Sequence, residues 1–234
     1  MVTESQIERI MERWFTVTGP WRVNDQGLVD VDGSVSLREH PDGSWPEIPV
    51  PFGTVTGRFE ARHVGLRSLK NSPRTVNMSL VVNHNLLKSL AHAPDLIRGD
   101  FEAAENGHLT QLDCANCVVM RDLDVQECNL TSLNNCAQVK QGLWAKDNPR
   151  LVDLKGIPAC EELFISYHPD LALLPALVVG RITVRNMTPH FPDRPDAFAQ
   201  MKTILNKHAG KGKSAMLNCA LDLKKAGFGS NAKW

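Results

Sequence analysis

Carboxylates are concentrated in one short part of the sequence, where they could act together. Seven acids lie between residues 100 and 127, against the single base Arg121: Asp100, Glu102, Glu105, Asp113, Asp122, Asp124 and Glu127. Such a set could bind a metal ion, transfer protons or attract a cationic partner. Residues 191–234 have the opposite balance, with eight bases and three acids. The formal net charge of zero therefore hides an acidic middle and a basic end.

The basic end contains half of a phosphate-binding loop. Residues 212–214 (GKS) match the second half of the pattern G-x-x-x-x-G-K-[ST], but Lys207 stands where the first glycine belongs. Residues 196–208 have helical spacing, whereas a phosphate loop follows a strand. We therefore predict a turn between two helices, with Gly210 ending the first and Ser214 capping the second. The alternative function is binding of an anion or of nucleic acid by Lys207, Lys211 and Lys213.

Six cysteines at irregular spacing, without a preceding apolar signal sequence, predict reduced thiols and a cytoplasmic protein. Cys114 and Cys117 form a C-x-x-C pair, and Cys136 occupies a similar place one repeat later. These three thiolates could bind zinc. However, no second C-x-x-C pair or evident fourth ligand accompanies them, and small buried cysteines are commoner. We therefore expect packed cysteines, no metal and no cofactor, with zinc as the alternative.

An internal repeat organises the middle of the chain. The pattern L-x-L-x-x-[NC]-x-L-x-x-L occurs at residues 80–90 and 123–133. Related units start at residues 59, 101, 143 and 163, so that successive starts are separated by 21, 21, 22, 20 and 20 residues. A unit this short cannot bury its own leucines, so the units must stack and join their strands into a parallel sheet. Partial units around Val35 and Ile182 extend the array.

This repeat resembles that of the leucine-rich-repeat proteins, within them the short-period bacterial type. The segments LKNSPRTV and LAHAPDLI are similar to the proline-bearing repeats of secreted bacterial effectors. The succession of VDVDGSVSL, IPVPFGTVTGRF and repeated L-x-x-x-P resembles leucine-rich-repeat proteins of tailed bacteriophages. The resemblance covers about residues 28–186 and implies protein binding through a concave sheet. The catalytic cysteine domain of ubiquitin-ligase effectors is not carried over, because Cys219 lies within a helical apolar pattern.

The predicted fold class is therefore an α/β solenoid. We expect a leucine-rich-repeat array with a parallel β-sheet on its concave face, a mostly extended convex side and helical caps. Residues 1–34 are expected to form an N-terminal cap of one helix and short strands. Residues 35–186 would form the solenoid, and residues 187–234 a C-terminal cap made of a helical hairpin.

Residues between the inward-facing leucines point out of such a sheet and stack in columns. The columns place the acids beside aromatic side chains that we expect to be exposed, as in binding hot spots. The expected partner-binding residues are Glu102, Glu105, Asp124, Glu127, Trp144, Phe164 and Tyr167. His63 and His84 share a column with two of these acids, but no nucleophile is paired with them. We therefore expect no enzymatic activity.

The expected function is that of a protein-binding module. An acidic face favours a basic protein as partner and disfavours nucleic acid. The phage-like resemblance implies that this partner is a host factor. No apolar run is long enough to span a membrane, so we expect no membrane partner. The sequence leaves the oligomeric state open.

Overall fold

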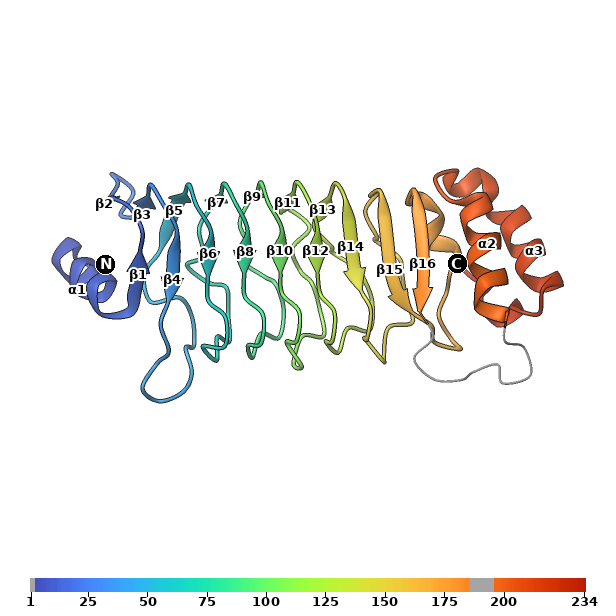
Figure 1. The fold of residues 1–234 in the computed structure, drawn as a ribbon, viewed down its shortest axis with the longest axis horizontal. Helices are drawn as coiled ribbons and strands as arrows, with labels where there is room; N and C mark the ends of the chain where they lie inside the picture. Colours follow the sequence, from blue (N-terminus) through green and yellow to red (C-terminus); the bar gives the residue numbers. More distant parts are fainter. Residues whose placement is uncertain (1–2, 186–195) are drawn as a thin grey trace.

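The chain winds into a β-solenoid of about seven turns (Figure 1). The computed structural model describes residues 3–185 and 196–234. Helix α1 (Glu4–Trp14) lies at one end, and α2 (Ala197–His208) and α3 (Met216–Lys225) lie at the other (Figure 1). The prediction of stacked parallel coils is confirmed, whereas the leucine-rich-repeat type and the capping role of the helices stay predictions. The boundary predicted between residues 186 and 187 lies outside the described residues.

One side of the solenoid is a nine-stranded sheet. Its strands, in spatial order, are β1 (Phe15–Val17), β4 (Val35–Leu37), β6 (Phe59–Glu60), β8 (Leu80–Val81), β10 (Phe101–Glu102), β12 (Leu123–Asp124), β14 (Gly142–Ala145), β15 (Glu162–Ser166) and β16 (Arg181–Arg185). Only β1 pairs antiparallel with its neighbour. Phe59, Leu80, Phe101, Leu123, Leu143 and Leu163 are aligned across successive strands. The register predicted from the repeat is confirmed, and Val35 and Ile182 extend it.

The return segments of the coils form a second sheet. It contains β2 (Trp21–Val23), β3 (Val29–Val31), β5 (Phe52–Val55), β7 (Thr75–Val76), β9 (Leu96–Ile97), β11 (Val118–Val119) and β13 (Gln138–Val139). All its pairs are parallel except β2 with β3. The return was predicted to be extended, and its strands additionally pair from coil to coil.

Buried asparagines tie each coil to the one before. Asn106 donates from its side-chain amide to the carbonyls of Val82 and Ala103 and accepts a bond from the Leu87 N–H group. Asn85 and Asn148 make equivalent bonds to their own neighbouring coils. Cys128 takes the same place in its coil, where its thiol contacts the Ala103 carbonyl at 3.7 Å. These bonds satisfy backbone groups that would otherwise be buried without partners.

The chain turns at the same point in successive coils, just after the nine-stranded sheet. The turning residue has a left-handed backbone, with φ between +53° and +59°, at His63, His84, Glu105, Glu127 and Asp147. Histidine and aspartate tolerate this conformation better than glutamate does. Because the turn recurs in register, the outward-facing residues before it stay aligned.

Helices α2 and α3 form the predicted hairpin. Gly210 has a φ of +71° just beyond α2, as expected of a residue that ends a helix. The prediction that Ser214 caps the second helix is wrong, because a 3₁₀ turn, η2 (Gly212–Ala215), precedes α3 and the Ser214 hydroxyl donates to the Lys211 carbonyl. Two further 3₁₀ turns are η1 (Leu174–Val178) and η3 (Gly229–Asn231). No described helix is long and apolar enough to cross a membrane.

Candidate functional site

Four of the predicted acidic and aromatic residues lie in one column on the outer face of the nine-stranded sheet. Glu102 pairs with Asp124, which pairs with Trp144, which in turn pairs with Phe164. Their side chains point outward because the leucine or phenylalanine before each one is buried. The aligned register therefore converts residues about 20 apart in the sequence into one continuous column.

A pocket of about 330 Å³ lies over β10, β12 and β14. It is lined by Asp100, Glu102, Asp122, Asp124, Gln126 and Trp144. Four carboxylates from two adjacent coils thus line one pocket together with an indole ring. We call this set the acidic pocket.

Asp124 is a half-buried carboxylate of the acidic pocket. Burial raises its pKa, although its Oδ1 atom accepts bonds from both the backbone and the side chain of Gln126, at 3.0 and 2.9 Å, and these bonds act in the opposite direction. Lys146 also lowers the pKa, and Asp122 raises it. Burial is the largest contribution, so the folded chain holds a carboxylate where its charge is disfavoured.

The other carboxylates of the acidic pocket have partners at its rim. Glu102 accepts bonds from Arg62 at 3.5 Å and from Asn83 at 3.3 Å. Asp100 lies 3.5 Å from the guanidinium of Arg121. Asp122 accepts a bond from the Gly142 N–H group at 2.7 Å. Arg62, Arg121 and Lys146 therefore offset part of the negative charge of the four acids, and one negative charge remains in excess.

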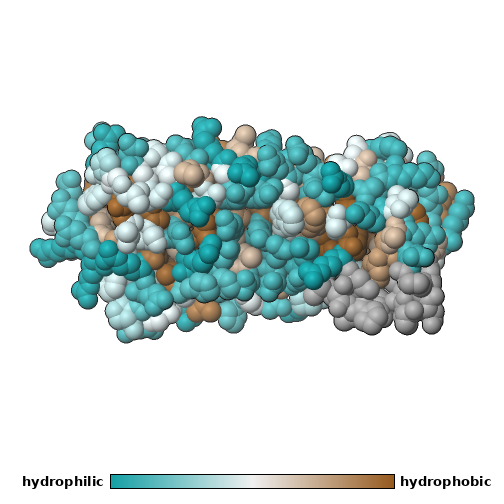
Figure 2. Space-filling view, viewed as in Figure 1, coloured by the Kyte–Doolittle hydropathy of each residue, from teal (hydrophilic) through white to brown (hydrophobic). Residues whose placement is uncertain are grey.

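The aromatic end of the column is a flat stack. The rings of Trp144 and Phe164 have centroids 3.8 Å apart and planes inclined by 8°. Lys146 lies with its ammonium 5.4 Å from the centre of the indole. Both rings are half-buried, so each presents part of its surface to solvent. Figure 2, in the view of Figure 1, shows a mainly hydrophilic surface interrupted by separate hydrophobic patches.

Comparisons with family models, curated proteins and solved structures found no match to this chain. Function is therefore inferred from the geometry of the described residues.

Glu105 and Glu127 lie at the rim of the face, at the left-handed turns, and both are exposed. Glu105 accepts a contact from the His84 ring at 2.9 Å, and that ring stacks on His63 with centroids 4.0 Å apart. These residues neighbour the acidic pocket without lining it. They add negative charge to its border.

Tyr167 does not belong to this surface. We expected it to be exposed beside the acids, but only 7% of it is accessible, and its hydroxyl lies 3.2 Å from the Asn231 amide oxygen. Asn231 arrives from the end of the chain and also donates to the carbonyls of His168 and Leu171. The expectation failed because a repeat pattern does not reveal a distant segment that folds over it.

The three lysines of the alternative function are not arranged around a shared site. The Lys207 ammonium bonds to Asp222 at 2.8 Å, and that of Lys211 bonds to the Lys207 carbonyl at 2.7 Å. Hydrogen bonds from Lys207, and then from His208, lower the pKa of Asp222 to about 2. Lys213 is exposed. Two of the three ammonium groups are therefore already engaged.

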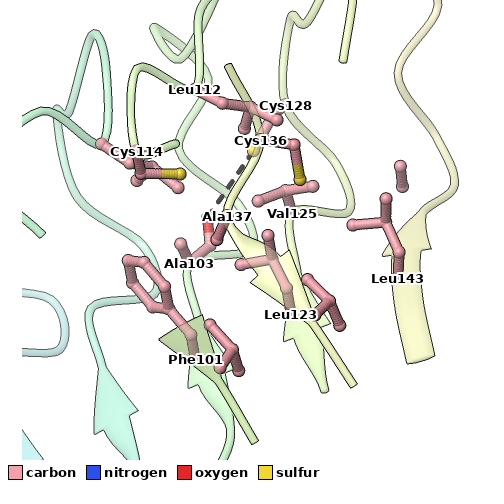
Figure 3. Close-up of a cluster of buried hydrophobic side chains, with 14 of the residues drawn as sticks. Phe101, Ala103, Leu112, Cys114, Leu123, Val125, Cys128, Cys136, Ala137 and Leu143 are labelled. Atoms are coloured by element: carbon pink, nitrogen blue, oxygen red, sulfur yellow. Dashed lines mark hydrogen bonds between the residues drawn. The ribbon is translucent and has the colours of Figure 1, made fainter. Parts of the chain in front are cut away.

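The cysteines lie in the core. Figure 3 shows Cys114, Cys128 and Cys136 among apolar side chains such as Phe101 and Leu123. Burial raises the pKa of Cys114 to about 12 and raises that of Cys136 strongly. Among the described residues, no three His, Cys, Asp or Glu side chains are placed to hold a metal ion, the candidate zinc ligands Cys114, Cys117 and Cys136 included.

The predicted binding residues left out three members of the acidic pocket, Asp100, Asp122 and Gln126. Asp100 and Asp122 each stand directly before the first buried residue of a strand. Asp100 and Asp122 belong to the predicted acidic centre, but the binding residues were chosen from the outward columns, which start one position after the first buried residue of each strand. The sequence could have revealed them, because Asp100 directly precedes Phe101 and Asp122 directly precedes Leu123, the aligned buried residues of two neighbouring repeats.

Proposed function

We propose that the outer face of the nine-stranded sheet binds a basic protein through the acidic pocket and the neighbouring aromatic stack. The observation that supports this most directly is the meeting of Asp100, Glu102, Asp122 and Asp124 with the Trp144 indole in one pocket. Concentrated like charge destabilises a sheet surface, and a binding partner would relieve that repulsion.

The preferred contact from the partner is an arginine side chain. A guanidinium can stack on an indole while its N–H groups bond to carboxylates in a bidentate manner. The acidic pocket provides both kinds of group within about 330 Å³. A lysine ammonium would gain the charge attraction but not the planar stacking.

The indole and phenyl rings would act as the apolar anchor of the interface. Half-buried aromatic rings gain further burial on binding at little entropic cost, and Trp is enriched among residues that dominate binding energy. Glu105 and Glu127 would form part of the polar rim. They would speed association more than they would slow dissociation.

We further propose that binding is the whole activity, without catalysis. The resemblance to leucine-rich-repeat proteins supports a role in protein recognition, and the phage-like order of motifs supports a host factor as the target. Six unpaired thiols, all buried, suit the reducing conditions of the cytoplasm. In this proposal the protein acts there by occupying a surface of its target.

The test is a quantitative capture from nuclease-treated bacterial lysate, followed by mass spectrometry. The face variant combines Asp124→Lys, Glu102→Lys and Trp144→Ala. Its matched control combines Asp25→Lys, Asp42→Lys and Val118→Ala, which alter similar types of residue outside the face. A specific protein should be retained by the native chain and by the control and lost by the face variant.

The captured protein should then bind the purified native chain in solution and lose binding when its own arginines are changed to lysine. Equal capture by the native chain and the face variant would refute the proposal. Circular dichroism and chemical unfolding of both variants should establish that each is folded.

A further inference from the structure

Helix α3 exposes an apolar stripe at the end of the solenoid. Leu217 is 72% accessible and Leu221, one turn later, is 47% accessible. Cys219 and Leu223 on the opposite side of the helix are buried in the core. Residues four apart lie on one side of a helix, so the two leucines form a continuous ridge. This ridge is separate from the acidic pocket and its proposed function.

Positive charge surrounds the ridge at both of its ends. Lys213 precedes the helix, and Lys224 and Lys225 occupy its last turn; all three are exposed. Within residues 3–185 and 196–234, no ion pair joins any of these three lysines to a carboxylate. Lys207, by contrast, is neutralised by Asp222. The apolar ridge therefore carries unpaired cations at its start and its end.

We propose that this outer face of α3 docks on an anionic lipid bilayer. The lipid phosphates would attract the lysines at both ends of the helix, and the apolar interior of the bilayer would bury the two leucines between them. Charge complementarity favours this occupant over the acidic pocket of a second copy. That surface mixes its carboxylates with cations, since Lys146 lies against the Trp144 ring and Arg185 pairs with Asp147.

A protein groove is a poorer fit, because such grooves usually grip three or more anchors spaced over two turns of helix. Here the next position along the ridge is Lys224. The sequence led us to expect no membrane partner, because that expectation considered only segments long enough to span. Surface docking needs no span, since it uses one side of a short helix.

The experiment is co-sedimentation of the full chain with vesicles made of equal parts phosphatidylglycerol and phosphatidylcholine. Vesicles of phosphatidylcholine alone provide the neutral comparison. The native chain should bind the anionic vesicles, release them in high salt and fail to bind the neutral ones. Each lysine near an anionic surface strengthens binding roughly five-fold, so Lys213→Gln, Lys224→Gln and Lys225→Gln together should weaken it roughly a hundred-fold.

A second variant, Leu217→Ser with Leu221→Ser, should weaken binding by roughly ten-fold or more. The matched controls are Lys88→Gln, Lys140→Gln and Lys155→Gln for charge, and Met78→Ser with Met120→Ser for exposed apolar area. Both controls should bind as the native chain does. Because all these side chains are exposed, the variants should fold, and their unfolding curves would check this.

Absence of binding by the native chain would overturn the proposal. If the control variants lost vesicle binding to the same extent, the proposal would also be overturned, because the chain would then bind anionic vesicles through its overall charge and exposed apolar area and not through α3. Retention of an acidic protein or of nucleic acid, with no binding to vesicles, would assign the ridge to another class of partner. None of these results depends on the acidic pocket, so the two proposals can fail separately.

Discussion

Asn206 of α2 completes the hydrogen bonding of Ile182 in β16, the last strand of the nine-stranded sheet. Its amide oxygen accepts a bond from the Ile182 N–H group at 2.9 Å, and its amide nitrogen donates to the Ile182 carbonyl at 2.8 Å. One side chain thus takes the place of a next strand. An unpaired edge would otherwise be open to another chain.

Asn206→Leu should therefore lower the free energy of unfolding by about 1–3 kcal/mol, because both backbone groups of Ile182 lose their partner. Chemical unfolding followed by circular dichroism measures this. Thr203→Ala, at an exposed position of the same helix, should change stability by less than about 0.5 kcal/mol. If the two variants are equally stable, the edge contact contributes nothing.

The buried asparagines should contribute more to the free energy of unfolding than Cys128, which takes the same position in its coil. Asn106→Ala should cost about 3 kcal/mol, because the Leu87 N–H group and the Val82 carbonyl are left buried without their partner. Cys128→Ala should cost only about 1 kcal/mol, since its thiol is a weak donor at 3.7 Å. Unfolding in urea would separate them. Equal costs would contradict the role assigned to these bonds.

Asp124→Asn should make the chain more stable at neutral pH and weaken its binding. Burial raises the pKa of Asp124, so ionisation of this carboxylate opposes folding, while an asparagine keeps the acceptor for Gln126 without the charge. The gain should be full above the folded pKa and vanish as the pH falls below the unfolded value. Unfolding curves of both proteins across the acid range test this. A destabilised variant at pH 7 would contradict it.

The buried thiols should be unreactive in the native chain and independent of metal. A thiol-specific reagent at mildly alkaline pH should modify all six cysteines in denaturant and few of them without it, because burial raises their pKa values and the thiolate is the reacting form. Dialysis against a chelator should leave the midpoint of thermal unfolding unchanged. A fall in that midpoint, reversed by zinc, would establish the zinc alternative at Cys114, Cys117 and Cys136.

The alignment of the strands was predictable because leucine spacing decides it. A slip of one residue would turn Leu123 or Leu143 to solvent, so the buried positions specify the register. The outward column from Glu102 to Phe164 follows directly from that register. This is why most of the candidate face could be named before its geometry was known.

Other features depend on contacts that no local pattern encodes. Four of the seven strands in the second sheet have only two residues, such as Leu96–Ile97, and are too short to show any periodicity. Tyr167 is buried because Asn231 reaches it from 64 residues away in the sequence. Asp100 and Asp122 join the pocket through the path of the turn before each strand.

Because the left-handed turn recurs at the same point, each coil starts and ends in the same orientation and adds the same length to the solenoid. A duplicated coil that ends at the same turn, as at Glu105 or Glu127, would return the chain to the sheet in the same orientation. Each such duplication would lengthen the molecule by about 4.8 Å, the spacing between neighbouring strands, and add one more side chain to every outward column. The proposed binding face could therefore be extended in defined steps to match a larger target, without redesign of the coils already present.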